Sequence, residues 1–149
     1  MRKFYTGFPL DKPHPAFKGE KKVWEPMLLV RIGSQRHATS PRFPAVVDSG
    51  SPFCIFHAQF GELIGIDITK GSQEEIGGII TGPKDPIYFH RIRLYVEADW
   101  VIDISAGFVK KLAVPGILGR TGFFDNFHVH FDHSELPPVL EIKKIEKPN

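Results

Sequence analysis

Short apolar segments, separated by connections that contain glycine or proline, constrain the fold of this chain more than any other feature. Segments rich in β-branched and aromatic residues are typical of β-strands, and glycine and proline are typical of the turns between them. We expect strands over residues 27–32, 45–47, 66–69, 76–81, 87–96, 100–109 and 139–145. Short helices are expected over residues 57–65 and 119–127. The pattern predicts a mostly β domain.

Length and charge limit the classes of function that are possible. A chain of 149 residues buries roughly 70% of its unfolded surface, which is enough for one hydrophobic core. Its formal net charge is only +2 and its basic residues are scattered, so we expect no nucleic-acid partner. Residues 1–22 contain several prolines and no regular apolar period. We therefore expect an extended N-terminal arm over residues 1–22 and one folded domain over residues 23–149.

Cysteine content and hydropathy bear on the location of the protein. Cys54 is the only cysteine in the sequence, which excludes an internal disulfide and fits a reducing compartment. No apolar stretch approaches the roughly 18 residues of a membrane span, and the first residues lack the apolar core of a signal peptide. We expect a cytoplasmic protein with no membrane partner.

A tight polar loop follows one of the expected buried strands. The segment Val46–Ser51 reads Val-Val-Asp-Ser-Gly-Ser, and the apolar run Phe53–Phe56 follows it. Asp48 would therefore lie at a loop tip held by core strands, which is how a rigid catalytic carboxylate is positioned. Taken alone, the Asp-Ser-Gly triplet also fits an ordinary turn in which Asp48 accepts backbone hydrogen bonds.

Two later segments help to interpret the Asp48 loop. Glycines and an expected hairpin occur over residues 76–89, and Ile117–Arg120 reads Ile-Leu-Gly-Arg just before an expected helix. In order and spacing, the three segments resemble those of the retropepsin-like aspartic proteases, the family of the retroviral proteases and their single-domain relatives. The resemblance covers roughly residues 25–145. It implies a closed, barrel-like acid-protease fold with a flap hairpin and one or two short helices.

The resemblance also implies roles for individual residues, and it implies no cofactor and no metal. Asp48 would be catalytic, supported by the loop residues Ser49, Gly50 and Ser51. The flap over the substrate would contain Gly77, Gly78 and Ile79. A structural segment near the site would contain Ile117, Leu118, Gly119 and Arg120.

Within the loop, the resemblance implies that Ser49 hydrogen-bonds across a two-fold axis and that Gly50 lets the backbone approach the substrate. Ser51 would donate a hydrogen bond to the Asp48 carboxylate. Such a donor favours the ionised form and would lower the apparent pKa values of a carboxylate pair, so we expect an acidic to weakly acidic optimum.

Aspartic protease chemistry requires two carboxylates that share a proton. The sequence holds one Asp-Ser-Gly, and its other acids in loops lack that setting: Asp67, Asp85, Asp103 and Asp125. We therefore predict a homodimer that acts on extended peptide or protein substrates. Retroviral enzymes place an acidic residue just after the loop to pair with the arginine of the later segment. Here Pro52 and Phe53 occupy those positions, so Arg120 needs another partner.

A second motif suggests metal chemistry. Residues 128–133 read His-Val-His-Phe-Asp-His, which resembles the first metal-binding motif of the metallo-β-lactamase fold. On this reading the protein is a metal-dependent hydrolase that uses His128, His130, Asp132 and His133. Only 16 residues follow His133, and none of them is His or Asp, so further ligands are lacking. Strict alternation with apolar residues favours a strand with a polar outer face.

Two further hypotheses remain open. Cys54 and His57 could form a nucleophile and base, but the sequence supplies no orienting third group, and a buried apolar role for Cys54 is favoured. A retropepsin-like fold could also bind peptides or dimerise without cleaving anything. The intact Asp48-Ser49-Gly50 loop argues for the peptidase.

Overall fold

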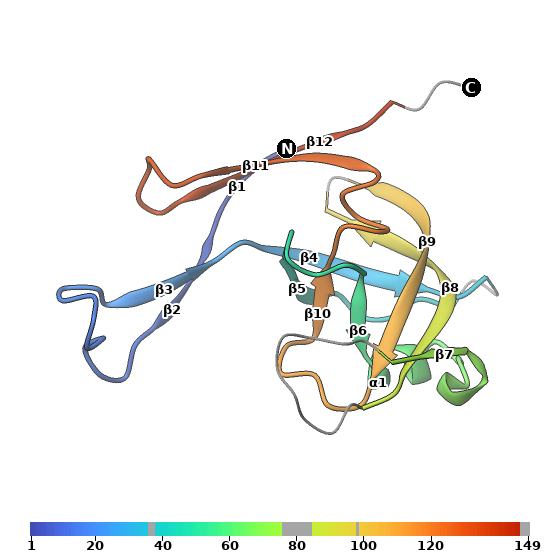
Figure 1. Ribbon diagram of the computed structural model, residues 1–149. Coiled ribbons are helices and arrows are strands. Elements are labelled where there is room, and N and C mark those ends of the chain that lie inside the picture. Colours follow the sequence, from blue (N-terminus) through green and yellow to red (C-terminus); the bar gives the residue numbers. More distant parts are fainter. Residues whose placement is uncertain (36–37, 76–84, 98, 147–149) are drawn as a thin grey trace. The chain divides into compact units, whose positions relative to one another are not determined.

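The computed structural model describes residues 1–35, 38–75, 85–97 and 99–146 (Figure 1). Contacts divide the chain into two compact units, one of residues 28–126 and the other of residues 1–27 together with 127–149. The segment 1–22, expected as an extended arm, contributes the strands β1 (Arg2–Phe4) and β2 (Thr6–Pro9) to the second unit.

The unit of residues 28–126 is built on one sheet that closes on itself (Figure 1). In order across the sheet, its strands are β4 (Met27–Gly33), β5 (Phe43–Val47), β10 (Gly116–Leu118), β6 (Ile55–His57), β9 (Trp100–Val109), β8 (Ile87–Val96) and β7 (Ser72–Glu74). β4 also pairs with β8, from Val30 opposite Val96 to Gly33 opposite Arg93, and this pairing closes a barrel. The closed, mostly β architecture predicted from the sequence is confirmed.

The burial of side chains changes along β9. From Val101 to Ser105 buried and exposed residues alternate, so one face of the strand meets the core. From Ala106 to Val109 every residue is buried. Gly61 lies against the ring of Phe108 there, and Ile87 and Phe89 lie against Gly107. The core of this unit includes the fully buried rings of Phe56 and Phe108.

A short helix, α1 (Ala58–Leu63), follows β6 and confirms the expected helix over 57–65. His57 caps its N-terminus, since the His57 Nδ1 atom accepts a hydrogen bond from the backbone N–H of Gln59 at 3.2 Å. The helix ends at Leu63, and Gly65, two residues later, has a φ of +79°, in the left-handed region that favours glycine. Among the described residues, no helix is both long and apolar enough to span a membrane.

The other unit holds two small antiparallel sheets. In one of them β12 (Val139–Lys144) lies between β1 and β11 (Phe127–Asp132). In the other, β2 pairs with β3 (Lys22–Glu25). Tyr5, which connects β1 to β2, is only 5% exposed, and its hydroxyl lies 3.2 Å from Nε2 of His133.

The prediction of a helix over residues 119–127 is wrong, since a series of turns occupies residues 120–126. Gly122 has a φ of +107°, which an α-helix does not allow. Two side chains stabilise the turns instead: Asp125 Oδ2 accepts a hydrogen bond from the Gly122 N–H at 3.1 Å, and Asn126 Nδ2 donates to the Gly122 carbonyl at 2.7 Å.

The strand expected over residues 66–69 is also wrong. A single 3₁₀ turn, η1 (Ile68–Lys70), is found there. The Asp67 Oδ1 atom accepts a hydrogen bond from Thr69 Oγ1 at 3.1 Å, and the Lys70 N–H donates to the Asp67 carbonyl at 3.1 Å. These local hydrogen bonds compete with strand pairing, which is typical of Asp and Thr in turns.

Candidate active site

The loop of Asp48 begins where β5 ends against β10. The two strands are parallel, with Ile117 opposite Val46 and Leu118 opposite Val47. The ladder extends one residue further, because the Asp48 N–H donates to the Leu118 carbonyl at 3.0 Å. Two segments that are seventy residues apart in the sequence therefore fix the position of the Asp48 backbone.

The Asp48 side chain is held by its own loop. Asp48 is half-buried, and its Oδ1 atom accepts a hydrogen bond from the backbone N–H of Gly50 at 2.8 Å. The Ser51 N–H donates to the Asp48 carbonyl at 3.2 Å, which closes a tight turn. Ser49 and Gly50 form the exposed tip of this turn. The loop thus presents an oriented carboxylate next to an exposed backbone.

The expectation for the Ser51 hydroxyl is wrong in this structure. Ser51 is 9% exposed, and its Oγ atom donates a hydrogen bond to the Phe53 carbonyl at 2.8 Å. The hydroxyl therefore stabilises the chain that leaves the loop, and the hydrogen bond to the carboxylate comes from the Gly50 backbone. From the sequence, a nearby hydroxyl and a nearby N–H are equally possible donors.

Gly119 brings the Ile117–Arg120 segment into direct contact with the loop. A Cβ at this position would overlap the Phe53 carbonyl and would come within 2.8 Å of the Ser51 carbonyl oxygen. The following N–H groups donate to the loop, from Arg120 to the Ser51 carbonyl and from Thr121 to the Pro52 carbonyl, each at 2.9 Å. The predicted structural segment therefore supports the loop by backbone contacts that only glycine permits.

The side chain of Arg120 also contacts the loop. Its Nη1 atom donates a hydrogen bond to the Ser49 carbonyl oxygen at 3.2 Å. The sequence left this arginine without the acidic partner that the retroviral enzymes supply, and a backbone carbonyl accepts its hydrogen bond instead. The contact ties the exposed tip of the loop to the segment that follows β10.

The predicted flap residues Gly77, Gly78 and Ile79 lie outside the described residues. The strands on either side of that segment are described, and β7 pairs antiparallel with β8 from Ser72 opposite Phe89 to Glu74 opposite Ile87.

An apolar wall begins on the chain that leaves the Asp48 loop, and it was not predicted from the sequence. Its members are the partly buried side chains of Phe53, Phe89 and Leu112, which pack on the buried Ile55, Ile87 and Val109. The rings of Phe53 and Phe89 meet edge to face, with centroids 5.1 Å apart and planes at 77°. Phe53 belongs to the chain that leaves the loop, so the wall begins five residues after Asp48.

Cys54 does not fit the role of a nucleophile. It is fully buried, and its Sγ atom lies 3.9 Å from the Gly119 carbonyl oxygen, which accepts its hydrogen bond. Burial raises the pKa of the Cys54 thiol to about 11, so the reactive thiolate is disfavoured. His57, the base considered for it, uses its Nδ1 atom to cap α1.

The histidine motif forms β11 and the residue after it, in the other unit. His128 and His130 are exposed, while Phe127 is buried, as the alternation indicated. The remaining members have other contacts: Asp132 Oδ1 accepts hydrogen bonds from Ser134, and the His133 ring lies against Tyr5. Within the described residues, no group of three or more His, Cys, Asp or Glu side chains is arranged to hold a metal ion.

Comparison with known proteins supports the fold alone. No protein-family model and no curated protein matches the sequence. A retropepsin-like aspartic protease from Rickettsia conorii is similar in structure, with a TM-score of 0.52 and 11% identity over 77% of this chain and 89% of that one. The retroviral protease-like domain of Ddi1 from Leishmania major has a TM-score of 0.50 and 19% identity over 80% of this chain and 90% of that one.

These likenesses and the closed barrel define a retropepsin fold, as the sequence predicted. Within that fold, the chain has an Asp-Ser-Gly loop braced by an Ile-Leu-Gly-Arg segment.

Proposed function

We propose that this protein is an aspartic endopeptidase that hydrolyses peptide bonds in extended polypeptides as a homodimer. The observation that carries the proposal is the half-buried Asp48 carboxylate, whose Oδ1 atom is oriented by the Gly50 N–H on a loop fixed by β5 and β10. Because this loop occurs within a retropepsin fold, we favour a catalytic role for Asp48 over a role in an ordinary structural turn.

The reaction requires a second carboxylate. In the proposed dimer, Asp48 of each subunit shares one proton with its counterpart. The ionised member takes a proton from the attacking water, and the protonated member donates its proton to the carbonyl oxygen of the scissile bond. The backbone N–H of Gly50 fixes one carboxylate oxygen, which limits the orientations that the side chain can adopt. No cofactor is needed for these steps.

The exposed tip of the loop supports the choice of a homodimer. Ser49 and Gly50 are exposed, so they are accessible to a second copy of the chain. Ser49 would hydrogen-bond across the two-fold axis, and Gly77, Gly78 and Ile79 would belong to the flap that covers the substrate. We retain the cytoplasm as the proposed location, on the single cysteine of the sequence.

The apolar wall favours substrates with a large apolar side chain near the cleaved bond. Phe53, Phe89 and Leu112 are only partly buried, so they offer apolar surface that begins five residues after Asp48 in the chain. Burying a substrate side chain of this kind contributes roughly 1.5–3 kcal/mol. The proposed substrate is therefore an extended peptide with an aromatic or large aliphatic residue at the position that meets this wall.

Asp48→Asn tests the proposal, because it removes the ionisable group and preserves the size of the side chain. Wild type and variant are incubated with a mixed peptide library between about pH 3 and pH 8, and cleavage is read by mass spectrometry. Asp103→Asn is the matched control, since Asp103 is an exposed carboxylate on β9. We expect cleavage by the wild type and by the control, and none by Asp48→Asn.

Sedimentation velocity of the same samples measures the oligomeric state. The proposal is supported if cleavage requires the dimer, if a pepstatin-like inhibitor blocks it and if it persists in the presence of a chelator. A demonstrated dimer that cleaves nothing would contradict it and favour a peptide-binding module. Activity abolished by a chelator would instead favour a metal-dependent hydrolase.

A further inference from the structure

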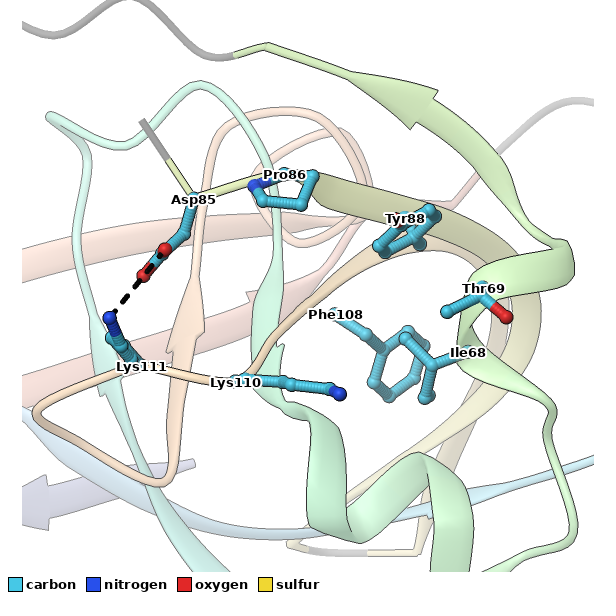
Figure 2. A pocket seen from close by; sticks show the side chains of 8 residues that line it. All are labelled: Ile68, Thr69, Asp85, Pro86, Tyr88, Phe108, Lys110 and Lys111. Atoms are coloured by element: carbon cyan, nitrogen blue, oxygen red, sulfur yellow. Dashed lines mark ion pairs between the residues drawn. The ribbon is translucent and has the colours of Figure 1, made fainter. Parts of the chain in front are cut away.

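The barrel unit contains a cavity of about 190 Å³ that is lined by none of the residues of the Asp48 loop. It lies between η1, the start of β8 and the residues that follow the end of β9 (Figure 2). An engineered protein cavity of about 150 Å³ binds benzene, so this volume accommodates one six-membered ring.

The floor of the cavity is apolar and rigid. Ile68 is 5% exposed and Phe108 is fully buried, and Pro86 and the ring of Tyr88 add apolar surface. Thr69 also lines the cavity, and its Oγ1 atom donates a hydrogen bond to Asp67 Oδ1. Gly61 of α1 packs directly behind this floor, since a Cβ there would come within 2.6 Å of Ile68 Cδ1 and 2.9 Å of Phe108 Cε1. The floor therefore has no free space into which to collapse.

The turn that carries Ile68 is also fixed. The Nε2 atom of His90, on β8, hydrogen-bonds to the Ile68 carbonyl oxygen at 2.8 Å. Gly71 lies so close to the same ring that a Cβ there would come within 2.5 Å of His90 Nε2. A site whose walls are held in this way loses little conformational freedom when a ligand binds.

The rim of the cavity is positively charged. Lys110 and Lys111 line it, and Asp85 is the carboxylate among the lining residues. Lys111 Nζ lies 4.0 Å from Asp85 Oδ1, whereas Lys110 has no ion pair within the described part of the chain. Figure 2 shows the Lys110 side chain extending toward the side of the cavity where Phe108 and Ile68 lie. One ammonium group therefore remains beside an apolar floor.

We propose that this cavity binds a small amphipathic anion, a carboxylate attached to one aromatic ring. The ring would lie on Ile68 and Phe108, and the carboxylate would pair with Lys110. Both features are needed, because Ile68 and Phe108 offer an apolar surface that an inorganic anion cannot use and the rim favours negative charge. The proposal does not depend on the chemistry of Asp48.

Phenylacetate is the probe that tests this site, with phenylacetamide and acetate as the matched compounds that lack the charge and the ring. Each is titrated into the full chain while NMR follows the Ile68 methyl and Thr69 amide signals. We expect saturable shifts with phenylacetate. Acetate should bind at least about ten-fold more weakly because it buries no ring, and phenylacetamide about two- to five-fold more weakly because it lacks the ion pair.

Variants test whether Lys110 provides the charge that pairs with the carboxylate of phenylacetate. Lys110→Gln should reduce phenylacetate binding to the level of phenylacetamide, whereas Lys143→Gln, an exposed lysine on β12, should leave it unchanged. Asp85→Asn should strengthen binding, because it removes the competing carboxylate. Three results would each overturn the proposal. Acetate could bind as tightly as phenylacetate, the NMR shifts could occur at residues away from the cavity, or Lys110→Gln could bind phenylacetate with wild-type affinity. Asp48→Asn should bind phenylacetate normally, which separates this site from the proposed peptidase.

Discussion

Gly119 lies against the carbonyl group of Phe53 so closely that a Cβ at position 119 would overlap it. This contact joins the segment after β10 to the chain that leaves the Asp48 loop. Two backbone hydrogen bonds from Arg120 and Thr121 flank it. The position of the loop therefore depends on the absence of a side chain at one residue, which explains why glycine is needed in the Ile-Leu-Gly-Arg segment.

Gly119→Ala should destabilise the protein by about 3 kcal/mol, because the added methyl group meets backbone atoms that cannot rotate away. Urea unfolding monitored by tryptophan fluorescence measures the change. Gly65→Ala is the control: Gly65 has open space around its Cβ position and a φ of +79°, so it should cost only about 1 kcal/mol of backbone strain. Equal costs for the two variants would contradict the steric argument.

Ser51→Ala tests whether the Ser51 hydroxyl stabilises the fold or acts on the Asp48 carboxylate. Because Ser51 Oγ donates to the Phe53 carbonyl, its removal should cost about 1 kcal/mol of folding free energy and leave the pH profile of peptide cleavage unchanged. Denaturant unfolding and kcat/KM measured against pH check the two parts. A pH profile displaced to higher pH would show that the hydroxyl acts on the Asp48 carboxylate instead.

Long, regular segments were the part of the fold that the sequence predicted well. The strands 87–96 and 100–109 occupy the expected residues, because the alternation of buried and more exposed residues over 91–96 and 101–105 is typical of a half-buried strand. The helix expected over 119–127 failed on one residue: Gly122 adopts a positive φ, and no local pattern distinguishes such a glycine from one tolerated within a helix.

The sequence indicated which two segments meet around Asp48, and it did not indicate which atoms of those segments form hydrogen bonds. Asp48 and the segment Ile117–Arg120 lie together as expected, because their motifs specify the loop and the strand beside it. The partners of Ser51 and Arg120 were missed, since several acceptors lie within reach of each side chain. The apolar wall depends on contacts between distant segments, which single-sequence patterns do not encode.

Arg120→Ala should weaken catalysis more than folding. The Nη1 hydrogen bond to the Ser49 carbonyl is exposed, so its loss should cost about 1 kcal/mol or less of stability. Misplacement of the loop tip should lower kcat about ten- to a hundred-fold. Arg93→Ala, which removes another exposed arginine, should change neither cleavage nor dimerisation. Wild-type kcat in Arg120→Ala would show that the contact is not needed for the reaction.

Cys54 should make the protein less stable at alkaline pH. Burial raises the pKa of its thiol from 9.0, the ordinary value, to about 11 in the folded chain. Above about pH 9 the unfolded chain binds fewer protons than the folded one, so stability falls with rising pH by up to about 1.4 kcal/mol per pH unit, until the folded thiol also ionises.

Urea unfolding of wild type and Cys54→Ala between about pH 8 and pH 10 isolates this contribution, because the other titrating groups cancel in the difference. We expect a steeper loss of stability in the wild type. Iodoacetamide should label Cys54 slowly in the folded protein and quickly in urea. Parallel pH slopes, or rapid labelling without denaturant, would contradict a buried neutral thiol.

Phe53→Ala should change substrate preference without abolishing cleavage. Its ring meets Phe89 edge to face and is only partly buried, so its removal should lower kcat/KM by about ten-fold for peptides with a large apolar residue near the cleaved bond. Peptides with alanine at that position should change little, because they make few contacts with the wall. Phe17→Ala, which removes an exposed ring in the other unit, is the control. A uniform loss for all peptides would instead assign Phe53 a role in holding the Asp48 loop.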